Sequence, residues 1–206
     1  IYPFRRGIRI ALIPAGSCFF VFGLLGLAVF AFLAAVYLAV EITEPELQED
    51  FRAMALRSAI AVAALARCRD GDPQRAIDAI GVAERPHLHV FIATSDIHLK
   101  HKLRISREEA LAEAVKWVRY GRERLGRDAE IEFSAEDASR TDIDYLMEVY
   151  AAVVEAGAST INIPDTVGYA IPSEFGALVK RSVDLVGRDA VISVHCHNDL
   201  GLATAN

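Results

Sequence analysis

Hydrophobic and polar positions alternate from residue 41 onward in a pattern that predicts short buried strands separated by amphipathic helices. The expected strands lie at 59–66, 87–94, 130–134, 159–163 and 190–194. The expected helices cover 45–57, 72–82, 106–125, 141–156 and 172–186. Strict alternation of short strands and helices indicates βαβ units and therefore a parallel sheet.

Local signals at the helix ends support these boundaries. The stretch from Ser106 to Glu109 matches a capping box, which opens a helix. Asp72 can cap a helix, and Pro73 fits its first turn. Gly157 is expected to end the helix that begins at Thr141.

Two architectures fit a parallel sheet of this kind: a (β/α)₈ barrel and an open doubly wound sheet. No glycine-rich turn follows the first expected strand, which disfavours a dinucleotide-binding open sheet. Polar residues recur where strands end, at Arg67, Ser134, Glu136, Thr166, His195 and His197. A barrel gathers its active site at the carboxyl ends of its strands. The predicted fold class is therefore α/β, with residues 41–206 forming a partial (β/α)₈ TIM barrel of about five of the eight βα units.

Residues 1–40 differ from the rest, because three arginines, Arg5, Arg6 and Arg9, are their only charged residues. The stretch 18–40 has no charge and exceeds the roughly 20 apolar residues that span a bilayer. The upstream arginines would keep the N-terminus cytoplasmic. Two interpretations stay open for this helical, apolar domain: a transmembrane segment, or a non-native stretch from a misread gene start or reading frame.

The overall charge and the cysteines narrow the function classes. The chain has 22 Lys and Arg against 28 Asp and Glu, a net charge of -6, which argues against a nucleic-acid partner. Its three cysteines, Cys18, Cys68 and Cys196, have no paired spacing, so neither a disulfide framework nor a structural zinc site is indicated. A reducing, cytoplasmic location is the expectation, and 18–40 leaves membrane association open.

Two histidines near the end of the chain are the first candidates for chemistry. His195 and His197 follow an apolar strand, and residues two apart on a strand point to the same side. Two imidazoles that share a face at a strand end can bind one divalent metal ion. Cys196 points the other way and is expected in the core.

The same alternation selects side chains on neighbouring strands that would face the two histidines. The candidates for a common pocket are His89, Ser134, Glu136, Asn162 and Thr166. Hydroxyl, amide and carboxylate groups around a metal suit an oxygen-rich ligand, such as a 2-oxo acid chelated through its carbonyl and carboxylate.

Simpler roles remain open for several of these residues. Ser134 and Thr166 could be capping or turn residues, and Glu136 with Asp137 could form a solvated loop pair. The polar loop 96–104 could cover the site, contact phosphate or be exposed.

Four blocks of the sequence resemble the 2-isopropylmalate synthase family of metal-dependent acyl-CoA condensing TIM barrels, which includes homocitrate and citramalate synthases as relatives. The blocks are LHVFIATSDIHLKHKLRISREEAL, EIEFSAEDASRTDIDYL, AGASTINIPDTVGYAIPSEFG and VISVHCHNDLGLATAN, within a match over roughly 46–206. The resemblance implies an acyltransferase that condenses acetyl-CoA with 3-methyl-2-oxobutanoate in leucine biosynthesis. The alternatives are a citramalate or homocitrate synthase-like enzyme, or a membrane-anchored non-catalytic relative.

The resemblance also implies roles for the candidate residues. His195 and His197 match the family's histidine ligands for Mg, Mn or Zn. The matching 2-oxo acid pocket comprises His89, Ser134, Glu136, Asn162 and Thr166, with Glu136 and His89 as the catalytic groups. Family members of full length are homodimers.

The sequence departs from the family pattern at both ends. The family's first strand carries D-x-T-L-R-D-G-x-Q, whose aspartate binds the metal, whereas residues 1–40 contain neither Asp nor Glu. The sequence stops at Asn206, before the G-x-G-E-R-x-G-N segment that supplies an asparagine ligand. Because metal affinity depends on the full ligand set, we expect this chain to be an N- and C-terminally incomplete synthase that is inactive alone.

Overall fold

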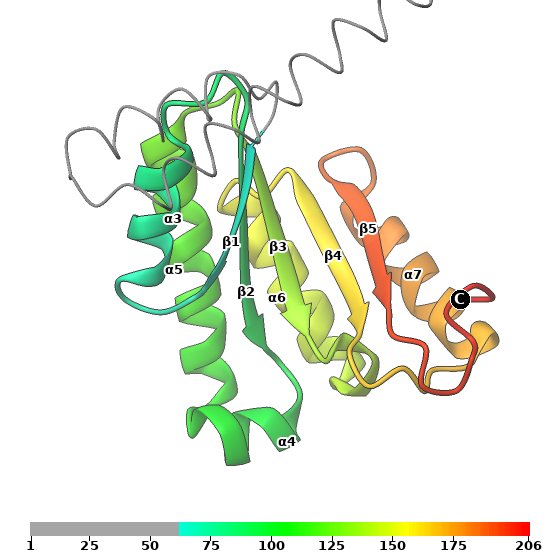
Figure 1. Ribbon diagram of the computed structural model, residues 1–206. Helices are drawn as coiled ribbons and strands as arrows, with labels where there is room; N and C mark the ends of the chain where they lie inside the picture. Colours follow the sequence, from blue (N-terminus) through cyan, green and yellow to red (C-terminus); the bar gives the residue numbers. More distant parts are fainter. Residues whose placement is uncertain (1–61) are drawn as a thin grey trace, which may run out of the picture. The chain divides into compact units, whose positions relative to one another are not determined.

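The structure, a computed structural model, describes residues 62–206, which contain a five-stranded parallel sheet (Figure 1). The strands are β1 (Val62–Arg67), β2 (Pro86–Ala93), β3 (Glu130–Glu136), β4 (Thr160–Asp165) and β5 (Val191–Cys196). Each strand pairs with the next one in the sequence, so the order is β1-β2-β3-β4-β5. An unreversed order is typical of a barrel, since an open doubly wound sheet reverses direction at a switch point. The prediction of a partial (β/α)₈ barrel is confirmed.

The longer helices cover one face of this sheet (Figure 1). They are α3 (Asp72–Ile80), α5 (Arg107–Leu125), α6 (Ile143–Glu155) and α7 (Pro172–Val186). Three short helical turns occupy loops after strands: α4 (Asp96–His98), the π-helix η1 (Leu99–Leu103) and the 3₁₀ helix η2 (Ala138–Arg140).

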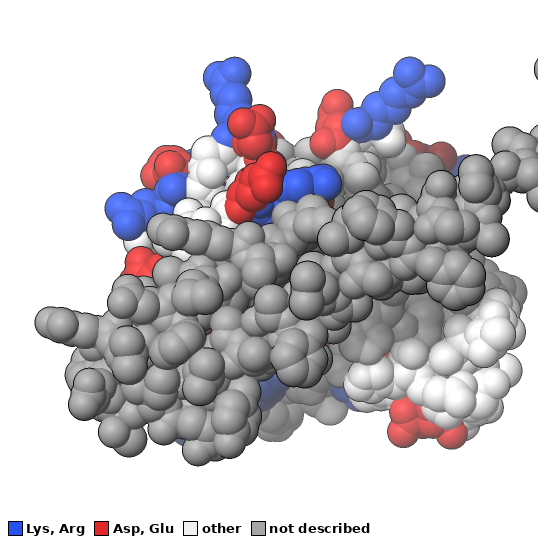
Figure 2. All heavy atoms as spheres, turned by 45° about the horizontal axis from the view of Figure 1, so that its top comes forward, with Lys and Arg blue, Asp and Glu red and all other residues white. Residues whose placement is uncertain are grey.

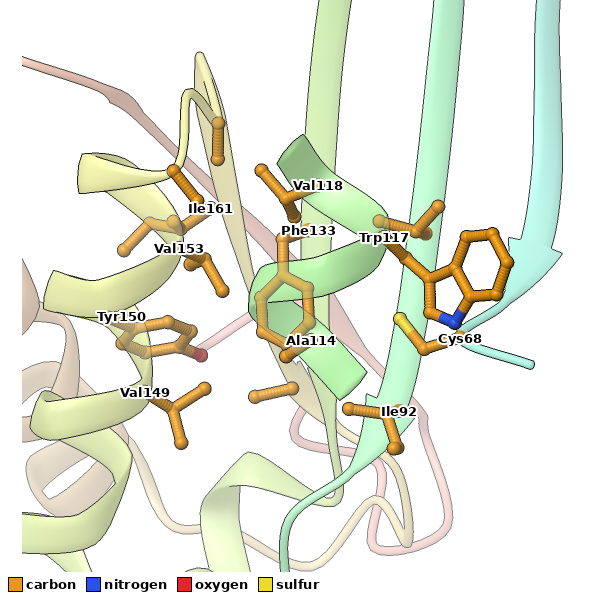
Figure 3. Close-up of a cluster of buried hydrophobic side chains, with 14 of the residues drawn as sticks. Cys68, Ile92, Ala114, Trp117, Val118, Phe133, Val149, Tyr150, Val153 and Ile161 are labelled. Atoms are coloured by element: carbon orange, nitrogen blue, oxygen red, sulfur yellow. The ribbon is translucent and has the colours of Figure 1, made fainter. Parts of the chain in front are cut away.

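Apolar side chains fill the space between the helices and the sheet (Figure 3). Alternate residues of the central strands, such as Leu88, Phe133 and Ile161, are 0% exposed. They meet Trp117 of α5 and Tyr150 of α6, which are likewise buried. Burying a side chain of this size stabilises the fold by roughly 1.5–3 kcal/mol. This layer therefore determines which residues of each strand face the helices.

The opposite face of the sheet is polar because the remaining residues of each strand point there. The strand register places His89 beside Glu132, Ser134 beside Asn162, and Pro164 beside His195. The predicted chemistry therefore lies on the face that the helices leave uncovered.

One of the two predicted helix N-caps is confirmed by the structure. The Ser106 hydroxyl accepts from the Glu109 N–H at 3.2 Å, and the Glu109 carboxylate accepts from the Ser106 N–H at 2.7 Å, which is the predicted capping box. The predicted cap at Asp72 is wrong: Gly71 is the N-cap, and the Asp72 carboxylate accepts from Arg67 Nε at 2.6 Å instead.

The predicted start of the fourth helix at Thr141 is also wrong. The 3₁₀ turn η2 comes first, and the Thr141 hydroxyl donates to the backbone oxygen of Asp137 at 2.9 Å. α6 begins at Ile143, because Asp142 accepts from the Tyr145 N–H at 3.0 Å and caps the helix.

Three strands run two residues further than their apolar stretches predict, among them β4, which ends at Asp165 and not at the expected residue 163. β3 reaches Glu136, because Glu136 still pairs with Ala93 of β2. β5 reaches Cys196, because Cys196 still pairs with Asp165 of β4. The predicted helix at 45–57 and the apolar segment 18–40 lie outside the described residues.

Charged side chains of both signs are interspersed on the described part of the face drawn in Figure 2. Surface ion pairs within residues 62–206 include Lys116 with Asp70 at 3.1 Å. No helix within residues 62–206 combines the length and the apolar character needed to cross a bilayer.

Candidate active site

A cavity of about 200 Å³ lies at the carboxyl ends of the strands, and we call it the strand-end cavity. Residues from or just beyond all five strands line it: Leu65, His89, Phe91, Ser134, Glu136, Pro164, Thr166, His195 and His197. Every predicted site residue except Asn162 is in this lining. Residues that are distant in the sequence are thus brought together at one end of the sheet.

The two candidate metal ligands lie side by side at the end of β5. The ring centroids of His195 and His197 are 4.9 Å apart, with 68° between the ring planes. The described residues, 62–206, contain no group of three or more His, Cys, Asp or Glu side chains that could hold a metal ion. The adjacent imidazoles fit part of a ligand set for a divalent cation and supply two nitrogen donors.

A glycine in the loop after β4 allows the segment with His197 to come close. Gly168 has φ of +66°, and an added Cβ would lie 2.5 Å from Asp199 Oδ2 and 2.9 Å from the carbonyl carbon of His197. The Leu200 N–H donates to the Gly168 oxygen at 3.1 Å, and the His197 N–H to the Asp165 oxygen at 3.2 Å. The β4 loop therefore holds His197 in place through backbone contacts.

His89 and Ser134 form a hydrogen-bonded pair in the lining. His89 Nε2 lies 2.6 Å from Ser134 Oγ, and Ser134 is 7% exposed. Burial lowers the pKa of His89, partly opposed by the nearby Glu132 carboxylate. The imidazole is thus neutral near pH 7, so one of its nitrogens accepts and the other donates.

A lysine of the polar loop after β2 contacts the site. Lys102 Nζ, in η1, donates to both carboxylate oxygens of Glu136, at 2.6 and 2.8 Å. Lys102 and Glu136 also line a second cavity of about 480 Å³, the β1–β2 cavity, together with Arg67 and Arg69. Glu136 therefore stands between two cavities, where it contacts a cation.

Asp137 is the buried support of the β3 loop. It is 0% exposed, has φ of +68°, and accepts hydrogen bonds from Ser95 Oγ and from Arg140 Nε at 2.8 Å. Its N–H donates to Thr166 Oγ1 at 2.9 Å. That bond uses a lone pair of Thr166 and leaves its hydroxyl proton able to donate elsewhere. The alternative in which Glu136 and Asp137 form a solvent-exposed loop pair is wrong, because Asp137 is buried.

Asn162 lies below the strand-end cavity in a second layer of polar side chains. Its Nδ2 donates to Ser193 Oγ at 3.0 Å and to Glu132 Oε1 at 3.3 Å. Glu132 Oε2 is in turn 3.0 Å from His87 Nε2. This hydrogen bond raises the pKa of His87 and lowers that of Glu132.

Comparison with known proteins identifies the family. The profile of the HMGL-like family matches residues 31–206. The chain belongs to this family. The match begins inside the apolar segment 18–40, so the domain boundary at residue 40 stays a prediction.

Curated relatives of this HMGL-like chain are named 2-isopropylmalate synthase. The protein from Pelotomaculum thermopropionicum is 55% identical over 149 residues, which cover 71% of this chain and 29% of the relative. The protein from Lactococcus lactis subsp. lactis is 51% identical over 148 residues, covering 71% and 28%. The chain thus spans less than a third of the length of these two relatives.

Solved structures share the fold of the HMGL-like chain. Hydroxymethylglutaryl-CoA lyase from Pseudomonas aeruginosa superposes with a TM-score of 0.58 at 19% identity, over 77% of this chain and 53% of the lyase. HMG-CoA lyase from Bacillus subtilis gives 0.59 at 20% identity, over 76% and 52%.

Sequence reasoning missed four residues that support the site of the HMGL-like chain: Lys102, Glu132, Asp137 and Gly168. Strand alternation does place Glu132 on the face of Ser134, which was a usable signal. The other three act through loops, whose paths the alternation of strands does not define.

Proposed function

We propose that residues 62–206 form the metal and 2-oxo acid side of a 2-isopropylmalate synthase active site. The proposed reaction condenses acetyl-CoA with 3-methyl-2-oxobutanoate and hydrolyses the thioester, giving 2-isopropylmalate and free CoA in leucine biosynthesis. The observation that carries the proposal is the strand-end cavity, where the two histidines of β5 meet His89, Ser134, Glu136 and Thr166. The names of relatives above 50% identity support the same reaction.

The chemistry of the cavity lining suits a small branched oxo acid. The free hydroxyl proton of Thr166 can donate to a carboxylate. Apolar Leu65, Phe91 and Pro164 in the lining suit a branched aliphatic side chain.

His195 and His197 would hold the divalent metal, which we propose is Mg, Mn or Zn. When bound, such an ion acts as a Lewis acid toward a 2-oxo carbonyl. The two imidazoles need to be neutral to serve as ligands.

We assign both Glu136 and His89 to catalysis, Glu136 to proton transfer and His89 to the hydrogen bond that orients the Ser134 hydroxyl. The Glu136 carboxylate lies between the strand-end cavity and the β1–β2 cavity, where it can reach the methyl group of an acyl thioester that enters from the latter. Lys102 fixes the orientation of that carboxylate through two hydrogen bonds. Arg67, Arg69 and Lys102 give the β1–β2 cavity cations that suit part of the anionic acetyl-CoA.

A chimera tests this function. The residues of the Pelotomaculum synthase that match this chain would be replaced by those of this chain, and acetyl-CoA-dependent thiol release would be measured with 3-methyl-2-oxobutanoate, pyruvate and 2-oxoglutarate. We expect turnover with 3-methyl-2-oxobutanoate, and at least a hundredfold loss in the Glu136→Gln chimera, as for a proton-transfer group. A folded chimera that prefers another oxo acid, or keeps its rate without Glu136, would contradict the proposal.

The remaining assignments follow from the same proposal. We infer a cytoplasmic enzyme that works as a homodimer in its complete form. Membrane fractionation of the 206-residue chain tests the location, and recovery in the membrane pellet would favour an anchor at 18–40.

A further inference from the structure

Glu132 lies at the centre of the polar layer beneath the strand-end cavity. Only 8% of the residue is exposed, and its carboxylate contacts side chains from two neighbouring strands. Oε1 accepts from Asn162 Nδ2 at 3.3 Å, while Oε2 lies 3.0 Å from His87 Nε2 and 3.7 Å from His89 Nδ1. Glu132 itself is absent from the lining of the cavity.

The two nitrogens of His89 face different partners. Nε2 contacts the Ser134 hydroxyl at 2.6 Å, and Nδ1 is the nitrogen directed at the Glu132 carboxylate. A neutral imidazole has one proton to place. On Nδ1 the proton faces a negative oxygen, whereas on Nε2 it would leave the lone pair of Nδ1 facing that oxygen, which is repulsive.

We propose that Glu132 is a positioning residue that keeps the proton of His89 on Nδ1 and thereby sets the donors and acceptors of the cavity. Nε2 is then an acceptor, so the Ser134 hydroxyl donates to it and presents only lone pairs to a ligand. Thr166, whose oxygen already accepts from the Asp137 N–H, presents a donor. Resting on the proposed function, the inference places the ligand's carboxylate beside Thr166 and away from Ser134.

A carboxylate, an imidazole and a hydroxyl in this order also occur in serine hydrolases. Ser134, however, lies inside β3, which is paired with β2 and β4 on both sides of it. The backbone N–H groups needed to stabilise an oxyanion are therefore engaged in the sheet. The three groups accordingly serve to orient protons, and Ser134 is not assigned as a nucleophile.

The substitution Glu132→Gln reverses the pattern in a defined way. Because Asn162 Nδ2 donates to the Oε1 position, a glutamine would place its oxygen there and its NH₂ group at the Oε2 position. That NH₂ carries two hydrogens, one for His87 Nε2 at 3.0 Å and one for His89 Nδ1 at 3.7 Å. The second would move the imidazole proton of His89 to Nε2.

The experiment is NMR of the metal-free 206-residue chain with ¹⁵N-labelled histidine at neutral pH, where long-range couplings show which nitrogen carries the proton. A His89→Asn sample assigns the signal. We expect the Nδ1–H form in the wild-type chain and the Nε2–H form in Glu132→Gln. The control is Glu130→Gln, the same change two residues earlier on β3 at an exposed position, which should keep Nδ1–H.

An Nε2–H signal in the wild-type chain, or an unchanged tautomer in folded Glu132→Gln, would overturn the inference. The wild-type spectrum decides the matter even where the variant fails to fold. The NMR measurement uses neither metal nor substrate, so its result holds even if the chimera is inactive. Conversely, the activity of the chimera does not depend on the tautomer of His89 in the NMR experiment.

Discussion

Supporting residues hold the side chains of the strand-end cavity from outside it. Glu132 lies beside His89 on the neighbouring strand, and the Asp137 backbone N–H donates to Thr166. The positions of such supports decide where protons and lone pairs point, since each hydrogen bond uses one donor and one acceptor. A substitution of a support should therefore change the chemistry of the cavity without removing a lining residue.

The His87–Glu132 pair should make stability depend on pH within a defined window. The pKa of His87 is raised from 6.5, so its contribution is complete below that value and is lost as pH rises through the raised pKa. The pKa of Glu132 is lowered from 4.5, so its contribution is present above that value and is lost as pH falls through the lowered pKa. The pair thus contributes fully between the two ordinary values.

We expect His87→Gln to lower the free energy of unfolding by about 1 kcal/mol inside this window and by less above it, because the pair is only partly buried. Urea denaturation followed by circular dichroism at several pH values measures the difference. His101→Gln, at an exposed histidine, is the control and should change the free energy of unfolding by less than about 0.5 kcal/mol. A loss that stays constant at high pH would show that the pair is not ionic in the fold.

Gly168→Ala should weaken metal binding, because the new methyl group would collide with the backbone around His197. We expect Zn²⁺ affinity, measured by isothermal titration calorimetry, to fall by about tenfold, equivalent to about 1.4 kcal/mol. Gly187→Ala is the matched control: φ is +57° there, yet an added Cβ has no heavy atom within 4 Å. Gly187→Ala should show the same strain of an alanine at positive φ and leave the Zn²⁺ affinity unchanged. Equal affinities of the wild-type and Gly168→Ala chains would refute the role of Gly168.

Strand alternation predicted the polar residues of the lining, with Asn162 as the exception, but neither its apolar residues nor its supports. The period of two placed His195 and His197 on one side and Ser134 with Glu136 on another strand, and the cavity contains all four. Lys102 reaches Glu136 from a π-helical turn, and Asp137 adopts a left-handed conformation. Neither feature follows from local propensity, because each depends on contacts between loops that are far apart in the sequence.

Helices and strands of this domain fit together through a few close approaches. An added Cβ at Gly121, in α5, would lie 2.6 Å from Leu88 Cδ2 of β2 and 3.4 Å from Ile131 Cδ1 of β3. Leu88 and Ile131 are both 0% exposed, so the core has little room to adjust. The period of α5 predicts a helix, but the distance between α5 and the sheet is a property of the packed structure.

The substitution Gly121→Ala should therefore destabilise the domain by about 1–3 kcal/mol, in spite of the better helix propensity of alanine. Gly176→Ala, in α7, has no heavy atom within 4 Å of the added Cβ and should stabilise the domain by up to about 1 kcal/mol. Thermal unfolding of the two variants measures effects of opposite sign from the same chemical change. Stabilisation by both would mean that α5 does not approach β2 this closely.

Within residues 62–206 taken together, β5 ends the strand order and pairs only with β4 (Figure 1). Val191 is 64% exposed and Val194 48% exposed on this strand, and Val183 and Leu185 of α7 are also exposed. A sheet edge with exposed β-branched residues can pair with another copy of itself. We therefore expect this chain to associate as its concentration rises, which static light scattering would detect.

A charge on this edge should suppress the association. Val191→Lys adds a lysine where edge pairing would bury it, and charged edge residues are a common way in which proteins block such pairing. Val82→Lys is the matched control, since Val82 is 53% exposed but lies after α3 and not on a strand. We expect Val191→Lys to lower the apparent molecular mass at high concentration and Val82→Lys to leave it as in the wild-type chain. Equal suppression by both variants would place the association elsewhere and make net charge, rather than the β5 edge, its cause.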